Sequence, residues 1–409
     1  MTPLHRIALF TLLALFALLA AVPTSAQQAP PDPPITIDTH VDIPFTYMRE
    51  PRFDAGKDTP LLVDLGKMER GGLNAAFFVI WVPQHELDAA GYAQAVDQAE
   101  SKYEAIGRML MMYPDRIRLA TSPDQAVANR KAGLLSAMIG IENAYSLGHD
   151  LHRLDAAYDR GARYVGLVHV GNNDLCTSSL PDTDHGESAM NSKGDHGMTD
   201  FGRQVVARAN RLGIMVDISH ASDACVRDAL AVSRAPLIAS HSGARAVLDH
   251  PRNLPDDLLR AIAAKGGVIQ AVAYKEFLKK DPGREAAEKK LQDEVARAAG
   301  DKKYDSDKHD YLPAMAAGMA KIQQRFPLPT LDDYVRQIRH MVDVAGIDHV
   351  GIASDFDGGG GITDWEDAGK TRNVAAALRR AGFSDADIAK IWGGNLLRVW
   401  REVERDARH

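Results

Sequence analysis

The sequence predicts an α/β protein built as a (β/α)8 TIM barrel, in which eight parallel strands close into a cylinder that helices surround. Eight short, nearly continuous apolar runs follow one another along the chain, and amphipathic stretches with helical spacing lie between them. Strands that are apolar on both faces are typical of parallel sheets covered by helices. An open doubly wound sheet is the alternative, because periodicity cannot show closure, but the number of strands favours the barrel.

The eight apolar runs are the expected strands, and each is six to nine residues long. They span residues 35–40, 74–81, 134–142, 163–170, 213–220, 235–241, 267–274 and 349–356. Residues 92–112, after the second run, and residues 199–212, before the fifth, are clear examples of the helical stretches between them. The regular alternation indicates repeated strand-helix units.

Most of the 409 residues are expected to form one domain, residues 35–409, with long loop insertions at the carboxyl-terminal face of the barrel. Residues 275–329 are charged, helix-prone and far longer than an ordinary connection, so we expect an insertion after the seventh strand. Residues 177–197 are rich in Ser, Asp and Gly and indicate a long surface loop. Loops at that face build the active sites of such barrels.

The first 26 residues have the pattern of a secretory signal peptide: an apolar run from Ile7 to Val22 precedes the small residues Thr24, Ser25 and Ala26. The run is shorter than the roughly 20 residues that a membrane span needs. Residues 27–34 read as a Pro-rich linker. With no cysteine near the cut and a charged C-terminus, we expect no membrane anchor after cleavage and an exported, periplasmic protein.

The composition gives no support for nucleic acid as a partner, and it does not decide whether the two cysteines are bonded. A formal net charge of −7, without a basic patch, gives no indication of nucleic-acid binding. The two cysteines, Cys176 and Cys225, would meet an oxidising compartment after export. A disulfide between them is one option, and the sequence does not decide it.

Polar side chains fall at the carboxyl ends of the expected strands. They are His40, Asp42, Glu142, His169, His220, His241 and Asp355. One strand-end histidine is more often a satisfied polar residue than a ligand, but seven such groups in phase with the strands indicate a shared site. Four histidines and three carboxylates suit Zn²⁺ ahead of Mn²⁺, Co²⁺ or Ni²⁺. The set is too large for one tetrahedral ion, so two ions sharing a carboxylate fit better.

Longer blocks around these residues carry a resemblance to a known family. They include IDTHVDIP, GIENAYSLG, GARYVGLVH, GIMVDISHAS, APLIASHSGARAVLDHPRNLP and GIDHVGIASDFDG. In these blocks, which run through most of the chain after residue 34, the sequence resembles the membrane dipeptidase (renal dipeptidase-like) family of the amidohydrolase superfamily. The resemblance implies a (β/α)8 barrel that holds two zinc ions per subunit and hydrolyses dipeptides. A homodimer is a further expectation from the family.

The resemblance also implies residue roles. His40 and Asp42 would bind one ion, His220 and His241 the other, and Glu142 would bridge both. His169 would polarise the scissile carbonyl, and Asp355 would take a proton from the nucleophile and pass it to the leaving amine. Arg252, in HPRNLP, would pair with the free carboxylate of the substrate, a task for which its planar guanidinium is suited.

The sequence therefore predicts an exported binuclear zinc dipeptidase that acts on L,L- and L,D-dipeptides with a free C-terminal carboxylate. One alternative is another metal-dependent amidohydrolase activity on the same barrel, such as N-acyl amino acid deacylation or the opening of a lactam or lactone. A second alternative is a non-catalytic peptide binder. Retention of Asp355 argues against the binder, because binding needs no proton shuttle.

Overall fold

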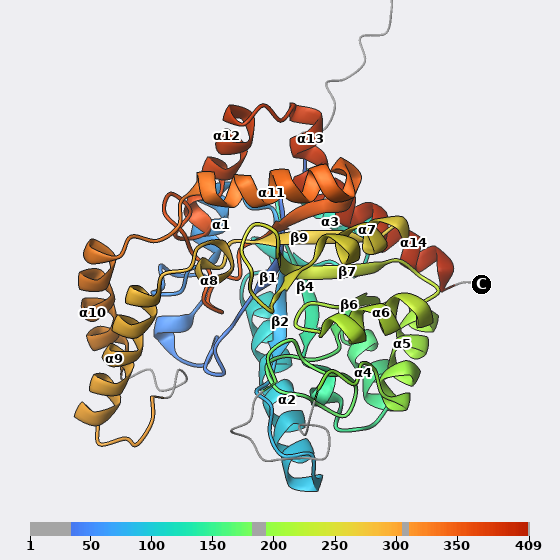
Figure 1. Ribbon diagram of the computed structural model, residues 1–409, viewed down its shortest axis with the longest axis horizontal. Coiled ribbons are helices and arrows are strands. Elements are labelled where there is room, and N and C mark those ends of the chain that lie inside the picture. Colours follow the sequence, from blue (N-terminus) through green and yellow to red (C-terminus); the bar gives the residue numbers. More distant parts are fainter. Residues whose placement is uncertain (1–33, 182–193, 305–310, 408–409) are drawn as a thin grey trace, which may run out of the picture. The chain divides into compact units, whose positions relative to one another are not determined.

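Eight parallel strands follow one another around a closed sheet in the computed structural model, which describes residues 34–181, 194–304 and 311–407 (Figure 1). In order they are β1 (Ile37–Val41), β2 (Ala75–Trp81), β4 (Leu135–Glu142), β5 (Ala162–Gly166), β6 (Met215–Asp217), β7 (Leu237–Ala244), β9 (Val268–Val272) and β10 (Val350–Ala353). A parallel bridge between Val41 and Phe356 and a 2.9 Å bond from the Asp42 N–H to the Phe356 carbonyl join the last strand to the first. The predicted barrel is confirmed over the open sheet.

Two short strands were not predicted, and four predicted strands are too long, of which those expected over 267–274 and 349–356 end at Val272 and Ala353. β3 (Ile117–Leu119) pairs with β4, and β8 (Asn253–Leu254) pairs with β7. The strands expected over 163–170 and 213–220 end at Gly166 and Asp217 instead. Beyond these ends the backbone bonds to loop residues, as when the Ser179 N–H donates to the His220 carbonyl.

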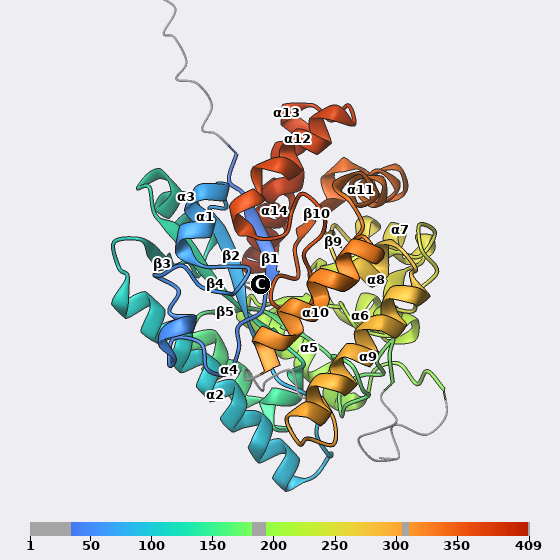
Figure 2. The ribbon, with the colours of Figure 1, turned by 90° about the vertical axis from the view of Figure 1, so that its left-hand side faces the viewer.

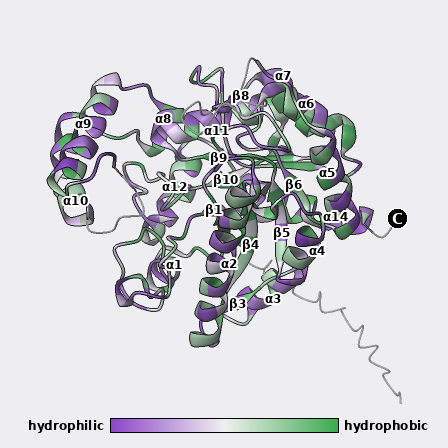
Figure 3. Cartoon of the chain, turned by 90° about the horizontal axis from the view of Figure 1, so that it is seen from below, coloured by the Kyte–Doolittle hydropathy of each residue, from purple (hydrophilic) through white to green (hydrophobic). Residues whose placement is uncertain are grey.

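An outer layer of helices covers the barrel (Figures 1 and 2). It comprises α1 (Leu65–Gly71), α2 (Ala89–Met112), α3 (Pro123–Lys131), α4 (His152–Asp159), α5 (Asp200–Leu212), α6 (Asp223–Val232), α7 (Asp256–Ala264), α11 (Leu331–Ala345), α12 (Arg372–Arg380), α13 (Asp385–Ala389) and α14 (Asn395–Asp406). Side chains of Asp64, Ser122, Thr199 and Ser222 cap the amino ends of α1, α3, α5 and α6. Figure 3 shows that these helices have one apolar side and one polar side.

The described parts of residues 275–329 are largely helical, as the sequence predicts. The helices are α8 (Lys275–Leu278), α9 (Pro282–Ala298) and α10 (Leu312–Arg325), of which α9 and α10 lie side by side outside the helical layer (Figures 1 and 2). The buried guanidinium of Arg284 joins the two, with Nε 2.6 Å from Glu288 Oε1 and Nη1 2.8 Å from Gln323 Oε1. The insertion thus has its own tertiary contacts.

The interior of the barrel is filled in layers. Trp400, from α14, lies against Phe77 of β2 with ring centroids 6.0 Å apart, and Phe77 lies 5.0 Å from the ring of Tyr164. All three side chains are fully buried. Above them, the Tyr164 hydroxyl lies 3.2 Å from His40 Nδ1. An apolar plug therefore supports the first polar side chain of the barrel mouth.

The expected signal peptide lies outside the described residues, and so does the linker apart from Pro34. Residues 182–193 of the expected surface loop lie outside them too. None of the described helices combines the length and apolar composition that a membrane crossing requires.

Replacing the base of the plug should destabilise the barrel. We expect Trp400→Ala to lower the free energy of unfolding by about 3–5 kcal/mol, because it leaves a large cavity under Phe77. Urea unfolding followed by circular dichroism measures this change. Arg401→Ala, at a half-exposed position on the same helix, is the control and should cost about 1 kcal/mol or less. Similar losses in both variants would contradict the layered packing.

Candidate active site

The predicted site residues meet at one cavity at the carboxyl ends of the strands. The cavity has a volume of about 520 Å³, and seven of the eight predicted residues line it: Asp42, Glu142, His169, His220, His241, Arg252 and Asp355. The eighth, His40, is 1% exposed and contacts the carboxylates of Asp42 and Glu142. The structure therefore brings the whole predicted set together.

Glu142 lies at the centre of the histidines. Its Oε2 is 3.2 Å from His40 Nε2, whereas its Oε1 is 3.0 Å from His220 Nε2 and 3.4 Å from His241 Nε2. His169 Nε2 is farther away, 3.9 Å from Oε1. The two carboxylate oxygens thus face different histidines, as a bridging ligand requires.

The local backbone sets these positions. Glu142 is the last residue of β4, while His40 and His241 lie within β1 and β7. His220 and Asp355 follow β6 and β10 in the left-handed region, with φ of 69° and 59°. Such backbone strain is maintained only where surrounding contacts hold it, and it is concentrated at functional sites.

Burial and charge shape the protonation of the cluster. Burial opposes the positive form of His40, but Glu142 and Asp42 outweigh it and raise the pKa of this histidine. Burial also opposes the charge of Glu142, yet His40 and His220 hold the pKa of that carboxyl well below its usual range. Burial lowers the pKa values of His220 and His241, and the nearby Arg252 cation adds to the effect. Neutral imidazoles beside a carboxylate form a ligand set for a divalent cation.

The donors fit metal ions. Ligand atoms within 4.8 Å of one another form three groups among the described residues: His40 with Glu142 and His241, Glu142 with His169 and His220, and His40 with Asp42 and Asp355. The Nε2 atoms of His220 and His241 lie only 2.9 Å apart. Buried imidazole and carboxylate groups converging in this way suit borderline metals such as zinc.

Arg252 brings a positive charge to the same cavity. It is 3% exposed, its Nη2 donates to the His241 carbonyl at 3.1 Å, and its Nε has no hydrogen-bond partner among the described residues. No described carboxylate lies within salt-bridge distance of it. Burial lowers its pKa to about 10, so the side chain stays charged at neutral pH. A buried guanidinium that faces a cavity is suited to an anionic ligand group.

Asp355 lies beside Asp42 under a close backbone contact. A Cβ on Gly358 would lie 2.2 Å from Asp42 Oδ2 and 2.5 Å from Asp355 Oδ1, so only glycine fits there. Burial raises the pKa of Asp355 well above its usual range, and the negative charges of Asp42 and Glu142 raise it further. The positive charges of His40 and Arg252 act in the opposite direction, so the affinity of this carboxyl for a proton depends on the charges around it.

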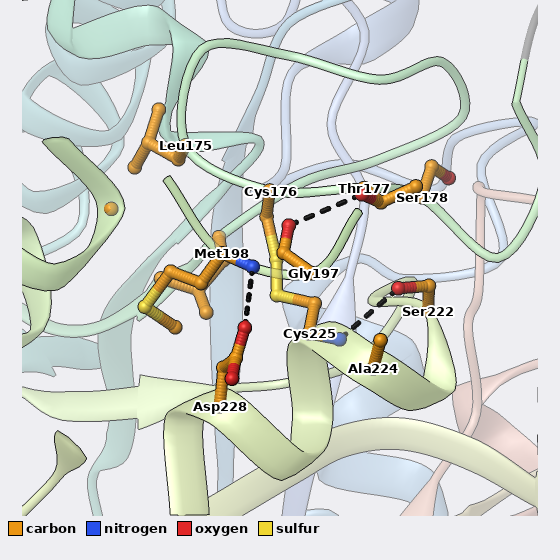
Figure 4. The surroundings of a disulfide bond; sticks show 12 residues. Leu175, Cys176, Thr177, Ser178, Gly197, Met198, Ser222, Ala224, Cys225 and Asp228 are labelled. Atoms are coloured by element: carbon orange, nitrogen blue, oxygen red, sulfur yellow. Dashed lines mark hydrogen bonds between the residues drawn. A yellow bond between two sulfur atoms is a disulfide. The ribbon is translucent and has the colours of Figure 1, made fainter. Parts of the chain in front are cut away.

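A disulfide braces the loops that carry two of the histidines (Figure 4). Cys176 and Cys225 are bonded, with Cα atoms 6.0 Å apart, and both are fully buried. Ser178 Oγ, two residues after Cys176, donates to the His169 carbonyl at 2.5 Å, and the Ser179 N–H donates to the His220 carbonyl at 2.7 Å. The sequence did not decide whether the two cysteines are bonded. The structure shows a disulfide that connects this loop to the first turn of α6.

Other lining residues were missed at the sequence level. They are chiefly aromatic or charged: Phe45, Trp81, Lys102, His250, Tyr274, Glu276 and Phe277. Trp81 and Tyr274 lie at the ends of predicted strands, so the rule used for the histidines could have found them. Lys102 lies within the long helix α2, with Nζ 4.8 Å from the ring centre of Phe45, and no sequence signal marks it.

Comparison with known proteins agrees with this geometry. The model of the membrane dipeptidase family, peptidase family M19, matches residues 32–409. A curated relative, the dipeptidase tcpJ of Claviceps purpurea (strain 20.1), is 29% identical over 371 residues, covering 88% of this chain and 73% of its own.

Solved structures give the same result. The crystal structure of the probable dipeptidase PvdM from Pseudomonas aeruginosa is 32% identical, with a TM-score of 0.77, over 91% of this chain and 96% of its own. The structure of a metallo peptidase described as dipeptidase AC is 25% identical, with a TM-score of 0.72, over 91% of this chain and 99% of its own.

The close contact at Gly358 predicts a sensitive position. We expect Gly358→Ala to lower kcat/KM on the order of 100-fold, because the new Cβ separates Asp42 from Asp355. Steady-state kinetics with a dipeptide measures this loss. Gly107→Ala is the matched control, because a Cβ there meets no atom within 4 Å. Full activity of the Gly358 variant would show that these carboxylates need not be close.

The disulfide should contribute to stability. It closes a loop between residues 49 apart in sequence, so we expect the Cys176→Ser, Cys225→Ser double variant to lose about 2–4 kcal/mol of unfolding free energy. Thermal unfolding with and without a reductant measures the change. The melting temperature of the wild type should fall in reductant and that of the variant should not. If the reductant cleaves the disulfide and the melting temperature of the wild type does not change, the disulfide does not contribute to stability.

Proposed function

The chain belongs to the membrane dipeptidase family of metallopeptidases, and on that premise we propose that it is an exported dipeptidase with two zinc ions in its site. It hydrolyses the single peptide bond of dipeptides that have a free C-terminal carboxylate. The observation that carries the proposal is the buried Arg252, which faces the same cavity as the metal donors and has no carboxylate partner among the described residues.

The proposed ligands divide into two sets. His40 and Asp42 would hold one ion, His220 and His241 would hold the other, and Glu142 would contribute to both sets. When bound, zinc supplies Lewis acidity toward a carbonyl oxygen and makes water a better nucleophile near neutral pH. The separate directions of the two Glu142 oxygens support this division.

Arg252 holds the substrate by its carboxylate. Its guanidinium can donate two parallel hydrogen bonds to a carboxylate, which fixes the orientation as well as the position of the ligand. Because Arg252 lies beside His241, a carboxylate bound there leaves room for only a short chain before the metal donors. This geometry favours dipeptides over longer peptides.

His169 and Asp355 act on the reacting groups. His169, which is 22% exposed at its side chain and directed toward Glu142, donates a hydrogen bond from its imidazole to the scissile carbonyl oxygen. Asp355 accepts a proton from the attacking water and delivers it to the leaving amine. The nearness of Asp355 to Asp42, enforced at Gly358, supports its place beside the nucleophile.

Export is part of the proposal. The first 26 residues have the features of a signal peptide that is removed after Ala26. The buried Cys176–Cys225 bond supports a destination in an oxidising compartment, because such bonds are rare in the cytosol. Mass spectrometry of the N-terminus of protein recovered from the periplasm tests the cleavage point.

The test uses zinc-loaded mature protein and a panel of L,L- and L,D-dipeptides, their C-terminal amides and N-acyl amino acids. We expect release of free amino acids from the dipeptides and little from the amides. Arg252→Met should lower kcat/KM for free dipeptides on the order of 100-fold or more, because it leaves a buried carboxylate unpaired. Arg227→Met, on the exposed face of α6, is the matched control.

Asp355→Asn gives an independent check on the chemistry. It should reduce kcat by about 10²- to 10⁴-fold while zinc content, measured by atomic absorption, stays unchanged. Equal cleavage of amides and free dipeptides, or activity on N-acyl amino acids alone, would refute the dipeptidase assignment and favour another amidohydrolase activity. Zinc binding without hydrolysis of any compound would favour a peptide binder.

A further inference from the structure

Ser240 lies between a buried carboxylate and one of the histidines of the site. Its Oγ is 2.6 Å from Asp217 Oδ2 and 2.8 Å from His241 Nδ1. Asp217 and Ser240 are 1% and 0% exposed, so water does not compete for these bonds. The three residues form an unbroken line of hydrogen bonds that leads into the cavity.

The direction of these bonds follows from counting protons. A hydroxyl has one proton to donate and lone pairs to accept others. Asp217 already accepts the N–H groups of Ser219 and Ser240 on Oδ1, at 3.0 and 2.7 Å, so it acts as a carboxylate acceptor. Ser240 therefore gives its proton to Asp217 Oδ2, the shortest of its three side-chain contacts, of which the longest is Ser219 Oγ at 3.4 Å, and it accepts from His241.

The consequence for His241 is a fixed tautomer. Its proton lies on Nδ1, where it donates to Ser240, and the lone pair lies on Nε2. Nε2 is the atom that faces Glu142 Oε1 at 3.4 Å and His220 Nε2 at 2.9 Å. A metal ion binds the lone pair of a neutral imidazole, so this tautomer is the one that a metal site requires.

We propose that Asp217 and Ser240 are positioning residues that set the tautomer and ring orientation of His241 before metal binds. The inference rests on the proposed metal-dependent function. Residues that orient metal-binding histidines through the far nitrogen typically change metal affinity by 10- to 100-fold when they are replaced. Here a serine transmits the effect of the carboxylate.

The other histidines of the site are supported differently. His40 Nδ1 has the Tyr164 hydroxyl at 3.2 Å, and that hydroxyl has the Thr39 carbonyl at 3.3 Å as its own acceptor. His220 Nδ1 is buried without a partner in the described part of the chain. Among these three histidines, His241 is therefore the one that bonds to the carboxylate-serine relay.

Asp217→Asn tests the relay because it keeps the shape of the side chain and reverses the direction of its hydrogen bond with Ser240 Oγ. The Asn carbonyl oxygen must still accept from Ser219 and Ser240 N–H, so its NH₂ group faces Ser240 Oγ and donates. The Ser240 proton, no longer bound to a carboxylate, is then available to His241 Nδ1, which favours the imidazole proton on Nε2. Histidine ¹³C and ¹⁵N chemical shifts of the metal-free protein report this tautomer directly. Chelator competition reports zinc affinity.

We expect Asp217→Asn to convert His241 to the Nε2–H tautomer and to weaken the binding of one zinc ion by 10- to 100-fold. Ser240→Ala, which removes the hydroxyl and keeps the carboxylate, should weaken it similarly and leave the tautomer unfixed. Ser136→Ala, which removes the hydroxyl of another buried strand serine that bonds Asn129, is the matched control and should change neither the His241 signals nor the zinc affinity.

An Nδ1–H tautomer that persists in both relay variants, or unchanged zinc affinity in folded variants, would overturn the inference. Failure of the wild type to bind zinc would overturn the proposed function instead, since the tautomer of His241 is read without metal. The two ideas therefore fail by different measurements.

Discussion

The buried carboxylate of Glu142 is the interaction on which the site depends. It is 3% exposed and lies within 4 Å of four imidazoles, so its charge has no water to stabilise it. A carboxylate in such a place needs compensating partners, because an unpaired buried charge costs far more than most single contacts contribute. The histidines, and the metal ions that they would hold, supply that compensation. The polar mouth is therefore one electrostatic unit.

A loop after β5 supports this unit in addition to the strands. Asn143, directly after Glu142, has a positive φ of 66° and accepts a 3.0 Å bond from Asn173 Nδ2. The loop that contains Asn173 continues through Cys176 to Ser178 and Ser179. These serines donate to the carbonyls of His169 and His220. A single braced segment thus contacts the Asn143 side chain and the backbone carbonyls of His169 and His220. Rigid support of this kind keeps reacting groups in register.

The sequence could predict the barrel and the convergence of the site for one physical reason: parallel strands all end at the same face. Strand-end positions therefore become neighbours whatever the loops do, which is why His40, Glu142 and His241 were identified. Loop-borne features behave differently. The lengths of β5 and β6, the Cys176–Cys225 bond and the approach of Lys102 from a helix depend on where loops and helices pack in space, and no local pattern encodes that.

Arg252 links substrate recognition to metal binding. Its positive charge, buried beside the cluster, lowers the pKa values of His169, His220 and His241, and so favours the neutral imidazoles that can bind metal. The same charge is the group proposed to hold the carboxylate of the substrate. A carboxylate that pairs with Arg252 would reduce this effect when substrate is present. The guanidinium can thus favour the neutral forms of His220 and His241 in the free protein and hold the substrate when it binds, without a change of position.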